Sequence, residues 1–205
     1  EITTRLVGSE MCIRDRNDSA EAIYNPEKYL LYCDPFMGQF DNRVKSGDAA
    51  GYADCAARLA VYADHAEYGY LFRSLRALCA FLSVKADLGI RTRAAYLSGN
   101  KKAAKALCTD YDAALERLDA FYAAYEQQWM HENKPQGFDV IDLRIGGQRQ
   151  RLLHCRDRLL AYAEGRLDRI EELEEPVLDC CCEEKADGQA TRAIFWHEIA
   201  SANVI

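Results

Sequence analysis

The sequence has few turn-forming residues, no long apolar run and no surplus of positive charge. Only 12 of its 205 residues are glycine and 4 are proline, which indicates a helical protein. Because no run of about 18 apolar residues occurs, nothing in the sequence is expected to span a membrane. With 26 basic and 33 acidic side chains, the net charge of −7 argues against a generic binder of nucleic acid or anionic membranes.

Features of an exported protein are also missing. The first residues lack the basic start, apolar block and small-residue cleavage site of a secretory signal. The nine cysteines are odd in number and contain no Cys-x-x-Cys pair. Most stand singly in apolar stretches, where cysteine behaves as a small hydrophobic residue, so we expect a cytoplasmic protein with reduced thiols.

No motif for metal, cofactor or covalent chemistry is complete. His131 and His197 each precede a glutamate, but Pro135 and Ser201 stand where a zinc protease needs its second histidine. Cys180–Cys182 could bind a soft metal with His197, yet adjacent residues do not easily converge on one ion, and buried thiols are the simpler interpretation. No nucleophile elbow or phosphate-binding glycine loop is present. We therefore predict no metal and no cofactor.

What the sequence does contain is a long succession of apolar residues at helical spacing. The pattern begins at Asp48, after a polar stretch, and the third and longest helix is preceded by Asn100 as a possible N-cap. Gly89 lies inside the second helix, where it costs about 1 kcal/mol, and Gly165 is expected to kink the fourth. The predicted helices cover residues 48–68, 71–97, 101–134 and 147–173.

The remaining segments complete the predicted architecture. Residues 23–40 contain two prolines and an apolar run, which is typical of an extended connector. Residues 138–147 alternate apolar and charged side chains, which predicts a loop, and loops carry function more often than helix faces do. The predicted fold class is all-α: a bundle of four to five helices, two or three of them long, with an extended N-terminal connector and an irregular C-terminal tail.

Charge is unevenly distributed near the C-terminus. Seven arginines lie between residues 144 and 169, and four of them (Arg149, Arg151, Arg156 and Arg158) are predicted to point outward from their helix. Eight acids lie between residues 171 and 187. A phosphate-binding surface should not adjoin such an acidic block, so salt bridges within the chain or a dimer are favoured and no nucleic-acid partner is expected.

The N-terminus differs in character from the rest. Residues 7–15, VGSEMCIRD, resemble a peptide that arises when sequencing adapters are translated into metagenomic gene models. We therefore interpret residues 1–16 as an adapter-derived or disordered leader outside the fold. The chain is then expected to be a fragment whose upstream sequence was lost near Arg16.

Three segments, in this order along the chain, resemble parts of one enzyme family. They are Tyr32–Asp41 (YCDPFMGQFD), Trp129–Gly147 (WMHENKPQGFDVIDLRIGG) and Arg166–Glu174 (RLDRIEELE). They are similar to the helical C-terminal domain of bacterial exo-acting β-N-acetylhexosaminidases of glycoside hydrolase family twenty. The similarity extends over residues 24–205, and the shared order makes it more specific than any single short motif.

The resemblance implies a larger enzyme with an N-terminal α/β domain and a catalytic barrel upstream of this helical unit. In the family a neighbouring Asp-Glu pair on the barrel performs the reaction. The glutamate protonates the glycosidic oxygen, and the aspartate orients the substrate's acetamido group, which attacks the anomeric carbon. This sequence contains no Asp-Glu dipeptide, and a barrel needs about 250 residues. We therefore predict no catalytic residue and no activity of the chain alone.

The resemblance thus implies a non-catalytic accessory or dimerisation domain. Residues 17–47 would be the connector from the barrel and residues 48–205 the helical domain, with the barrel and a second copy of the chain as partners. We expect the segment Asn133–Gly147 to lie against the barrel rim. The candidate interface or sugar-proximal residues are Trp129, Asn133, Asp139, Asp142 and Arg144.

Two alternatives stay open. Asp142 and Arg144 could simply pin the loop and cap the following helix. The chain could also be a free-standing helical module that binds a partner protein through the tyrosines of the third helix or through the arginines. A domain separated from its barrel should expose an apolar patch, whereas a native module should not.

Overall fold

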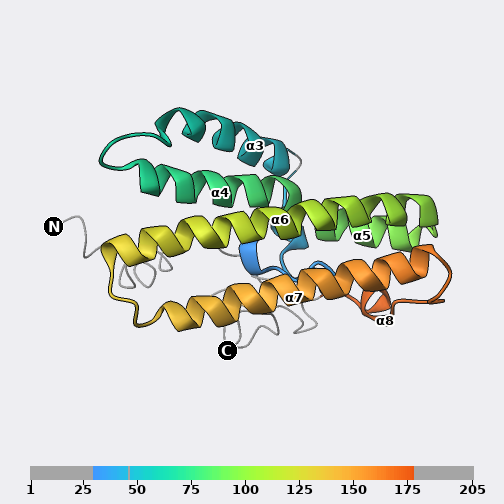
Figure 1. The fold of residues 1–205 in the computed structure, drawn as a ribbon. Helices are drawn as coiled ribbons and strands as arrows, with labels where there is room; N and C mark the ends of the chain where they lie inside the picture. The colour runs from blue at the N-terminus through green and yellow to red at the C-terminus, as the bar shows by residue number, and fades with distance from the viewer. Residues whose placement is uncertain (1–29, 46, 178–205) are drawn as a thin grey trace, which may run out of the picture.

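A computed structural model describes residues 30–45 and 47–177, and these residues form an all-α fold without a strand (Figure 1). The predicted fold class is therefore confirmed. The N-terminal leader and the C-terminal tail lie outside the described residues. The helices of ten or more residues are α3 (Asp48–Leu59), α4 (Gly69–Lys85), α5 (Leu88–Leu97), α6 (Lys101–Glu132) and α7 (Phe138–Ala163). Shorter helices are η1 (Asp41–Arg43), η2 (Ala60–Tyr62) and α8 (Glu171–Glu174).

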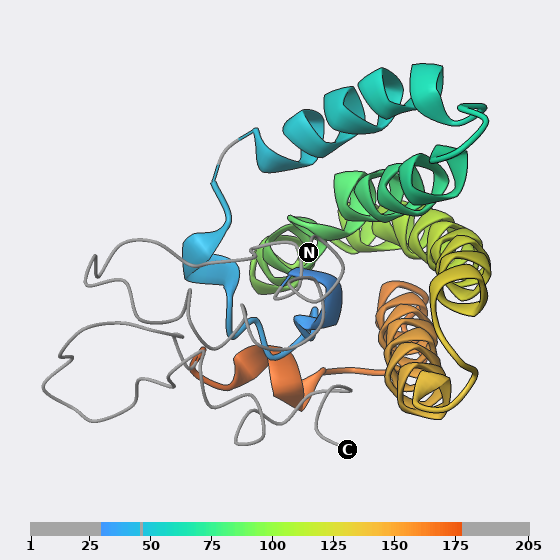
Figure 2. The same ribbon diagram turned by 90° about the vertical axis from the view of Figure 1, so that its left-hand side faces the viewer.

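The two longest helices, α6 and α7, lie side by side as an antiparallel hairpin (Figure 1). On the other side of α6, α4 packs against it and α3 packs against α4, while α5 covers the end of α6 nearest its N-terminus. Residues 30–40 lie among α5, α7 and α8 (Figure 2). In the part of the chain that the structure describes, no helix has both the length and the apolar character needed to cross a bilayer.

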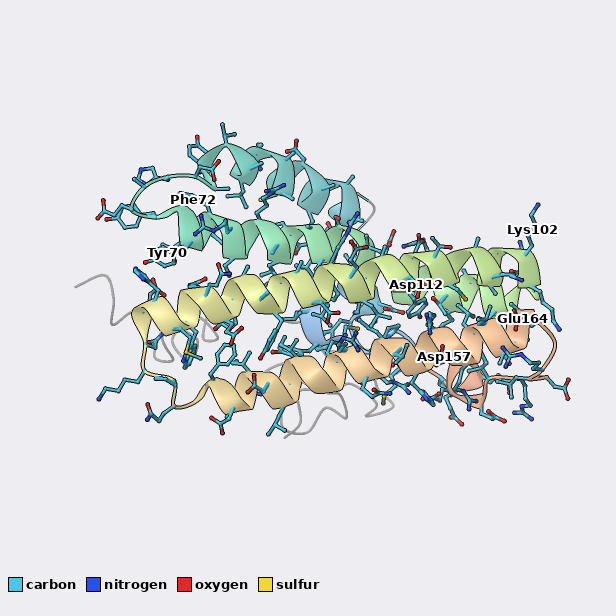
Figure 3. The ribbon with its side chains drawn as sticks, viewed as in Figure 1. Tyr70, Phe72, Lys102, Asp112, Asp157 and Glu164 are labelled. Carbon is cyan, nitrogen blue, oxygen red and sulfur yellow. The ribbon has the colours of Figure 1, made fainter. Side chains whose placement is uncertain are left out.

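The core forms where α6 and α7 face each other. Asn100 caps α6 as predicted, because its side-chain oxygen accepts a hydrogen bond from the Ala103 N–H at 3.0 Å. Further along, Tyr111 and Leu118 are fully buried, and Leu152 of α7 lies in the same core cluster. At the surface the hairpin is joined by ion pairs, such as that of Arg156 with Asp112 at 2.6 Å (Figure 3).

Residues 30–40 differ from the extended connector that we expected. Residues 30–32 form a helical turn, and the chain turns again at residues 35–37. Phe36 and Phe40 are fully buried, so this segment contributes to the core of the helical domain. The buried Lys85 side chain of α4 closes the helical turn, since its Nζ donates to the carbonyls of Leu30 and Cys33 at 3.2 and 2.6 Å.

The helix predicted over residues 71–97 is broken into α4 and α5 at Ala86 and Asp87. The break lets the start of α5 approach the turn at Pro35. A Cβ on Gly89 would lie 2.9 Å from the Pro35 carbonyl oxygen, so only glycine fits there without displacement. Gly89 therefore permits a close contact between distant segments, which sequence periodicity does not show.

Two other helices end earlier than predicted. The first ends at Tyr62 rather than Tyr68, because His65 Nδ1 accepts hydrogen bonds from the Glu67 and Tyr68 N–H groups at 3.3 and 3.1 Å and so forms a turn. The fourth ends at Ala163 and does not continue to residue 173. Gly165 adopts φ +76°, a left-handed conformation that ends a helix rather than kinking it.

None of the five described cysteines forms a disulfide bond, and four of them are buried. Burial raises the pKa of the Cys33 thiol to about 11 and raises the pKa values of Cys108 and Cys155 above their ordinary value. These thiols stay protonated in the fold at a pH where an exposed thiol ionises. The cysteines are Cys33, Cys55, Cys79, Cys108 and Cys155.

We predict that the protein loses stability as the pH rises above 9. Unfolding exposes thiols with the ordinary pKa of 9.0, so between pH 9 and about 11 the unfolded chain releases protons that the folded chain keeps. Each such thiol lowers the free energy of unfolding by about 1.4 kcal/mol per pH unit. Urea denaturation at several pH values should show that the free energy of unfolding falls less steeply with pH in Cys33→Ala than in the wild-type protein. The half-buried Cys55 provides the control, and an equal change of slope in Cys55→Ala would contradict the assignment.

Candidate functional site

The segment predicted as a functional loop lies at the end of the bundle where α6 turns into α7 (Figure 1). The prediction of a loop over residues 138–147 is wrong, because α7 begins at Phe138 and only residues 133–137 form the turn. Phe138 and Ile145 lie inward at helical spacing, whereas Leu143 is 54% exposed. The alternation of apolar and charged residues is therefore the start of an amphipathic helix.

Three of the five predicted site residues shape this turn. Trp129 Nε1 donates to the Lys134 carbonyl at 2.9 Å, and the Asn133 N–H donates to the Trp129 carbonyl at 2.8 Å. The Asp139 carboxylate accepts from the Gly137 N–H at 3.1 Å. These contacts are all local, so the geometry of the turn accounts for Trp129, Asn133 and Asp139 without a ligand.

The other two predicted residues lie on different sides of α7. Asp142 accepts a hydrogen bond from the Tyr122 hydroxyl at 2.7 Å, which raises the pKa of Tyr122 to about 12 and joins α7 to α6. Arg144 lies on the side that faces residues 30–32. Burial raises the pKa of Tyr32 to about 12, and the nearby charge of Arg144 opposes that rise. The structure therefore does not bring all five residues into one site.

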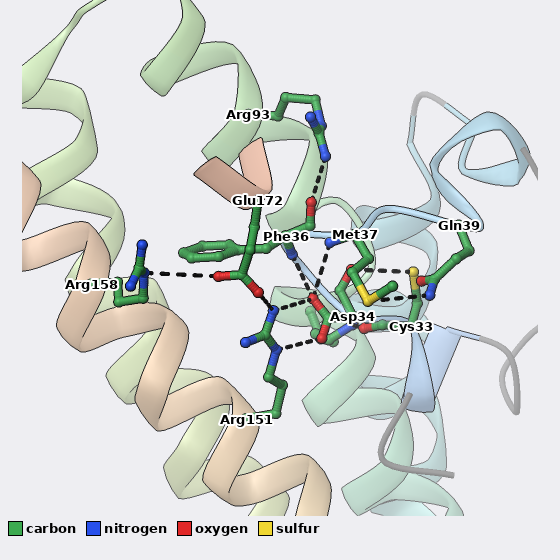
Figure 4. Close-up of polar contacts among 10 residues, drawn as sticks. Cys33, Asp34, Phe36, Met37, Gln39, Arg93, Arg151, Arg158 and Glu172 are labelled. Carbon is green, nitrogen blue, oxygen red and sulfur yellow. Dashed lines mark hydrogen bonds and ion pairs between the residues drawn. The ribbon is translucent and has the colours of Figure 1, made fainter. Parts of the chain in front are cut away.

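Sequence reasoning missed a buried ion network centred on Asp34 (Figure 4). Asp34 is 4% exposed, and its Oδ1 accepts from the backbone N–H groups of Phe36 and Met37 at 2.8 and 3.1 Å. Arg151 of α7 binds both carboxylate oxygens of Asp34 and also pairs with Glu172 of α8 at 2.5 Å. Arg151 was predicted to point outward, but its side chain is 22% exposed and reaches into this network.

Two more arginines strengthen the same junction (Figure 4). Arg93 of α5 donates to the carbonyl oxygens of Phe36 and Leu173, the latter at 2.7 Å. Arg158 of α7 pairs with Glu172 at 3.8 Å and with Glu171 at 2.9 Å. The sequence signal that could have indicated this network is the pair Asp34-Pro35. Such a pair starts a turn in which the aspartate side chain accepts hydrogen bonds from the backbone just after it. Its partner 117 residues away could not be identified from that signal.

The arginine-rich stretch is used mainly for internal pairing. Among the described residues, six of the seven arginines between positions 144 and 169 form ion pairs with acids of this chain, and Arg144 is the exception. For these six arginines, the predicted salt bridges within the chain are therefore present. No three histidine, cysteine, aspartate or glutamate side chains gather as a possible metal site in residues 30–45 and 47–177. Cys180–Cys182 and His197 lie outside this region.

Comparison with known families assigns the chain. The family model for the Glycoside Hydrolase 20C C-terminal domain matches residues 7–192, which is most of the sequence. The chain belongs to this family. No curated protein matches it significantly. The matched range includes residues 7–16, and the adapter origin of the leader stays a prediction.

The structure locates the three segments that showed the resemblance within this Glycoside Hydrolase 20C C-terminal domain. The first contains Asp34, the second forms the α6–α7 turn, and the third contains α8 with Glu172. Asp34 and Glu172 meet at Arg151, four residues beyond the end of the second segment. Two of the three segments are thus joined by one side chain.

We predict that Asp34→Ala lowers the free energy of unfolding by about 3–5 kcal/mol, because it leaves the partly buried Arg151 without its main partner. The control is Asp119→Ala. The Arg149–Asp119 pair, at 2.7 Å, is about half exposed on both sides, so its loss should cost less than about 1 kcal/mol. Urea denaturation measures both values. Similar losses of unfolding free energy in the two variants would show that the Asp34 network stabilises the fold no more than an exposed ion pair does.

Proposed function

We propose that this chain is the accessory domain of a β-N-acetylhexosaminidase and packs against the catalytic barrel of the same polypeptide. Membership of the Glycoside Hydrolase 20C C-terminal domain family supports this proposal. In it, the barrel removes terminal β-linked N-acetylhexosamine by substrate-assisted hydrolysis. The chain itself has no adjacent Asp-Glu pair and contributes no catalytic group.

The observation that carries the proposal is the anchoring of residues 30–40 in the helical core. The buried pair of Asp34 with Arg151 and the hydrogen bonds from Lys85 hold this segment on α4 and α7. The segment that would lead from the barrel is therefore fixed on the helices from residue 30 onward. A fixed junction suits a unit that supports a neighbouring domain.

The face proposed to meet the barrel is the end of the bundle at the α6–α7 turn. Met130, Val140 and Leu143 are 43%, 38% and 54% exposed there. Exposed apolar side chains around polar turn residues are typical of a surface covered by another domain. The candidate residues Trp129, Asn133, Asp139, Asp142 and Arg144 belong to this end of α6 and α7 and are assigned to the interface or to the vicinity of the sugar.

The proposed location is the cytoplasm. The absence of disulfide bonds among the five described cysteines supports a reducing compartment. Nucleic acid is not a proposed partner, because a phosphate-binding surface needs arginines that are free of internal carboxylates. Six of the arginines in the basic stretch have such carboxylates within the described part of the chain.

We predict that the chain alone releases no nitrophenol from a nitrophenyl N-acetyl-β-glucosaminide. A longer polypeptide with the upstream genomic sequence restored should release it, because the catalytic pair then is present. The control is the long polypeptide with that acidic pair changed to amides. Activity of the chain alone would contradict the proposal. A lack of activity in both proteins would favour the helical interaction module instead.

The proposed accessory domain also dimerises, through the end formed by α3, η2 and α4. The helix α3 contacts α4 but has no buried residue, so much of its surface is available to a second copy. Nearby, Val61 is 80% and Leu75 is 50% exposed, and the Tyr62 ring lies 5.2 Å from Phe72 (Figure 3). This surface adjoins the α6–α7 turn, because the Tyr70 hydroxyl of α4 donates to Glu132 at the end of α6 at 3.0 Å, but it is formed by different helices.

Sedimentation equilibrium should give about twice the chain mass of 23.2 kDa. The variant Val61→Asp should sediment as a monomer, because a charge at an apolar interface is desolvated without a partner. Leu143→Asp, on the surface proposed for the barrel, is the matched control and should remain dimeric. A wild-type monomer at tens of micromolar, or equal effects of both variants, would rule out this dimer.

A further inference from the structure

Three arginines of α7 lie seven residues apart and therefore on one side of the helix, and we call them the arginine row: Arg144, Arg151 and Arg158. Arg151 and Arg158 each bind carboxylates, with Asp34, Glu171 and Glu172 as their partners. Arg144 forms no ion pair with any residue that the structure describes. Its Nε is buried and has no hydrogen-bond acceptor there.

Beside Arg144 lies a second side chain with unused hydrogen-bonding groups. Gln148 is 1% exposed, and neither its Oε1 nor its Nε2 has a partner within the described region. The two residues are four positions apart and so are neighbours on the helix surface. A buried polar group without a partner costs about 1–3 kcal/mol, and native proteins contain few of them. Two such residues on one side of α7 are suited to binding a polar group from outside the described residues.

The chemistry of these atoms identifies the missing group. The Arg144 Nε–H and the Gln148 Nε2–H are donors, whereas the Gln148 Oε1 is an acceptor. Because the guanidinium carries a positive charge, the group that complements the two donors is an anionic acceptor. A carboxylate accepts from several N–H donors, and the other two arginines of the row bind carboxylates. Asp142, two residues before Arg144, is bound by the Tyr122 hydroxyl on the α6 side and is therefore not the carboxylate that pairs with Arg144.

We propose that Arg144 and Gln148 form a carboxylate-binding site, and that an aspartate or glutamate of the preceding catalytic domain occupies it. The choice of occupant rests on the function proposed above. Two features support it. The site faces Tyr32, in the segment that precedes the helices, and the row already uses Arg151 to bind the carboxylate of Asp34 in that segment.

The first test uses the 205-residue chain and sodium acetate as the probe, with sodium chloride at equal ionic strength as the reference. Acetate at 100 mM should shift the NMR resonance of the Arg144 Nε–H and raise Tm by about 2 °C. Arg144→Met should lose both responses. Arg149→Met, on the α6 side of the same helix, should keep both. No acetate response in the wild-type chain would overturn the carboxylate site.

Gln148→Leu separates binding from stability. Removing an amide without partners should raise Tm in chloride, while the loss of the Nε2–H donor should abolish or greatly reduce the acetate shift. A purely structural glutamine would not give a more stable protein with a lost acetate response. If Gln148→Leu keeps the full response, Gln148 is not part of the site.

The second test identifies the occupant, in the longer polypeptide that includes the catalytic domain. There the site should already be filled, so acetate should leave the Arg144 signal unchanged, and Arg144→Met should lower Tm more than it does in the chain alone. An acetate response that persists would show that the site takes a free carboxylate ligand and would overturn the domain contact. Nitrophenol release by the same polypeptide tests the proposed function separately, since it depends on the catalytic pair and not on Arg144.

Discussion

The pairing of Asp34 with Arg151 is the interaction on which the arrangement of this domain depends. Removing a carboxylate and a guanidinium from water is costly, and the cost is offset only when geometry and additional hydrogen bonds are good. Asp34 meets that condition, because both its oxygens contact Arg151 and one also accepts two backbone N–H groups. The pair consequently specifies a single position for residues 30–40 on α7.

Several otherwise unrelated features follow from that position. Gly89 lacks a side chain because the Pro35 backbone lies against it, and Lys85 is buried because it donates to the carbonyls of residues 30 and 33. Arg93 and Glu172 connect the same segment to α5 and α8. Residues upstream of the predicted helices are therefore part of their core. In this Glycoside Hydrolase 20C C-terminal domain, residues 30–40 are thus fixed relative to the helices that follow them.

Two adjacent surfaces of the bundle differ in character (Figure 1). At the α6–α7 turn, local hydrogen bonds of Trp129 and Asp139 order the backbone while apolar side chains such as Leu143 remain exposed. On the adjacent surface, α3 packs against α4 and η2 and has no buried residue. The arginine row lies on another side of α7, which faces residues 30–40 and α8.

The all-α class and the extent of α6 follow from the sequence alone, because an uninterrupted helical period and the Asn100 cap are local signals. The sequence was ambiguous at residues 138–147, since Phe138, Val140, Ile141, Leu143 and Ile145 fit both an alternating segment and one face of a helix. It also determined the family, through three ordered segments. The break at Ala86, the inward direction of the Arg151 side chain and the lack of an ion pair at Arg144 among residues 30–45 and 47–177 appear only in the folded structure. The physical reason is that partners such as Asp34 and Arg151 are 117 residues apart, and a local pattern does not encode which distant group a charged side chain will meet.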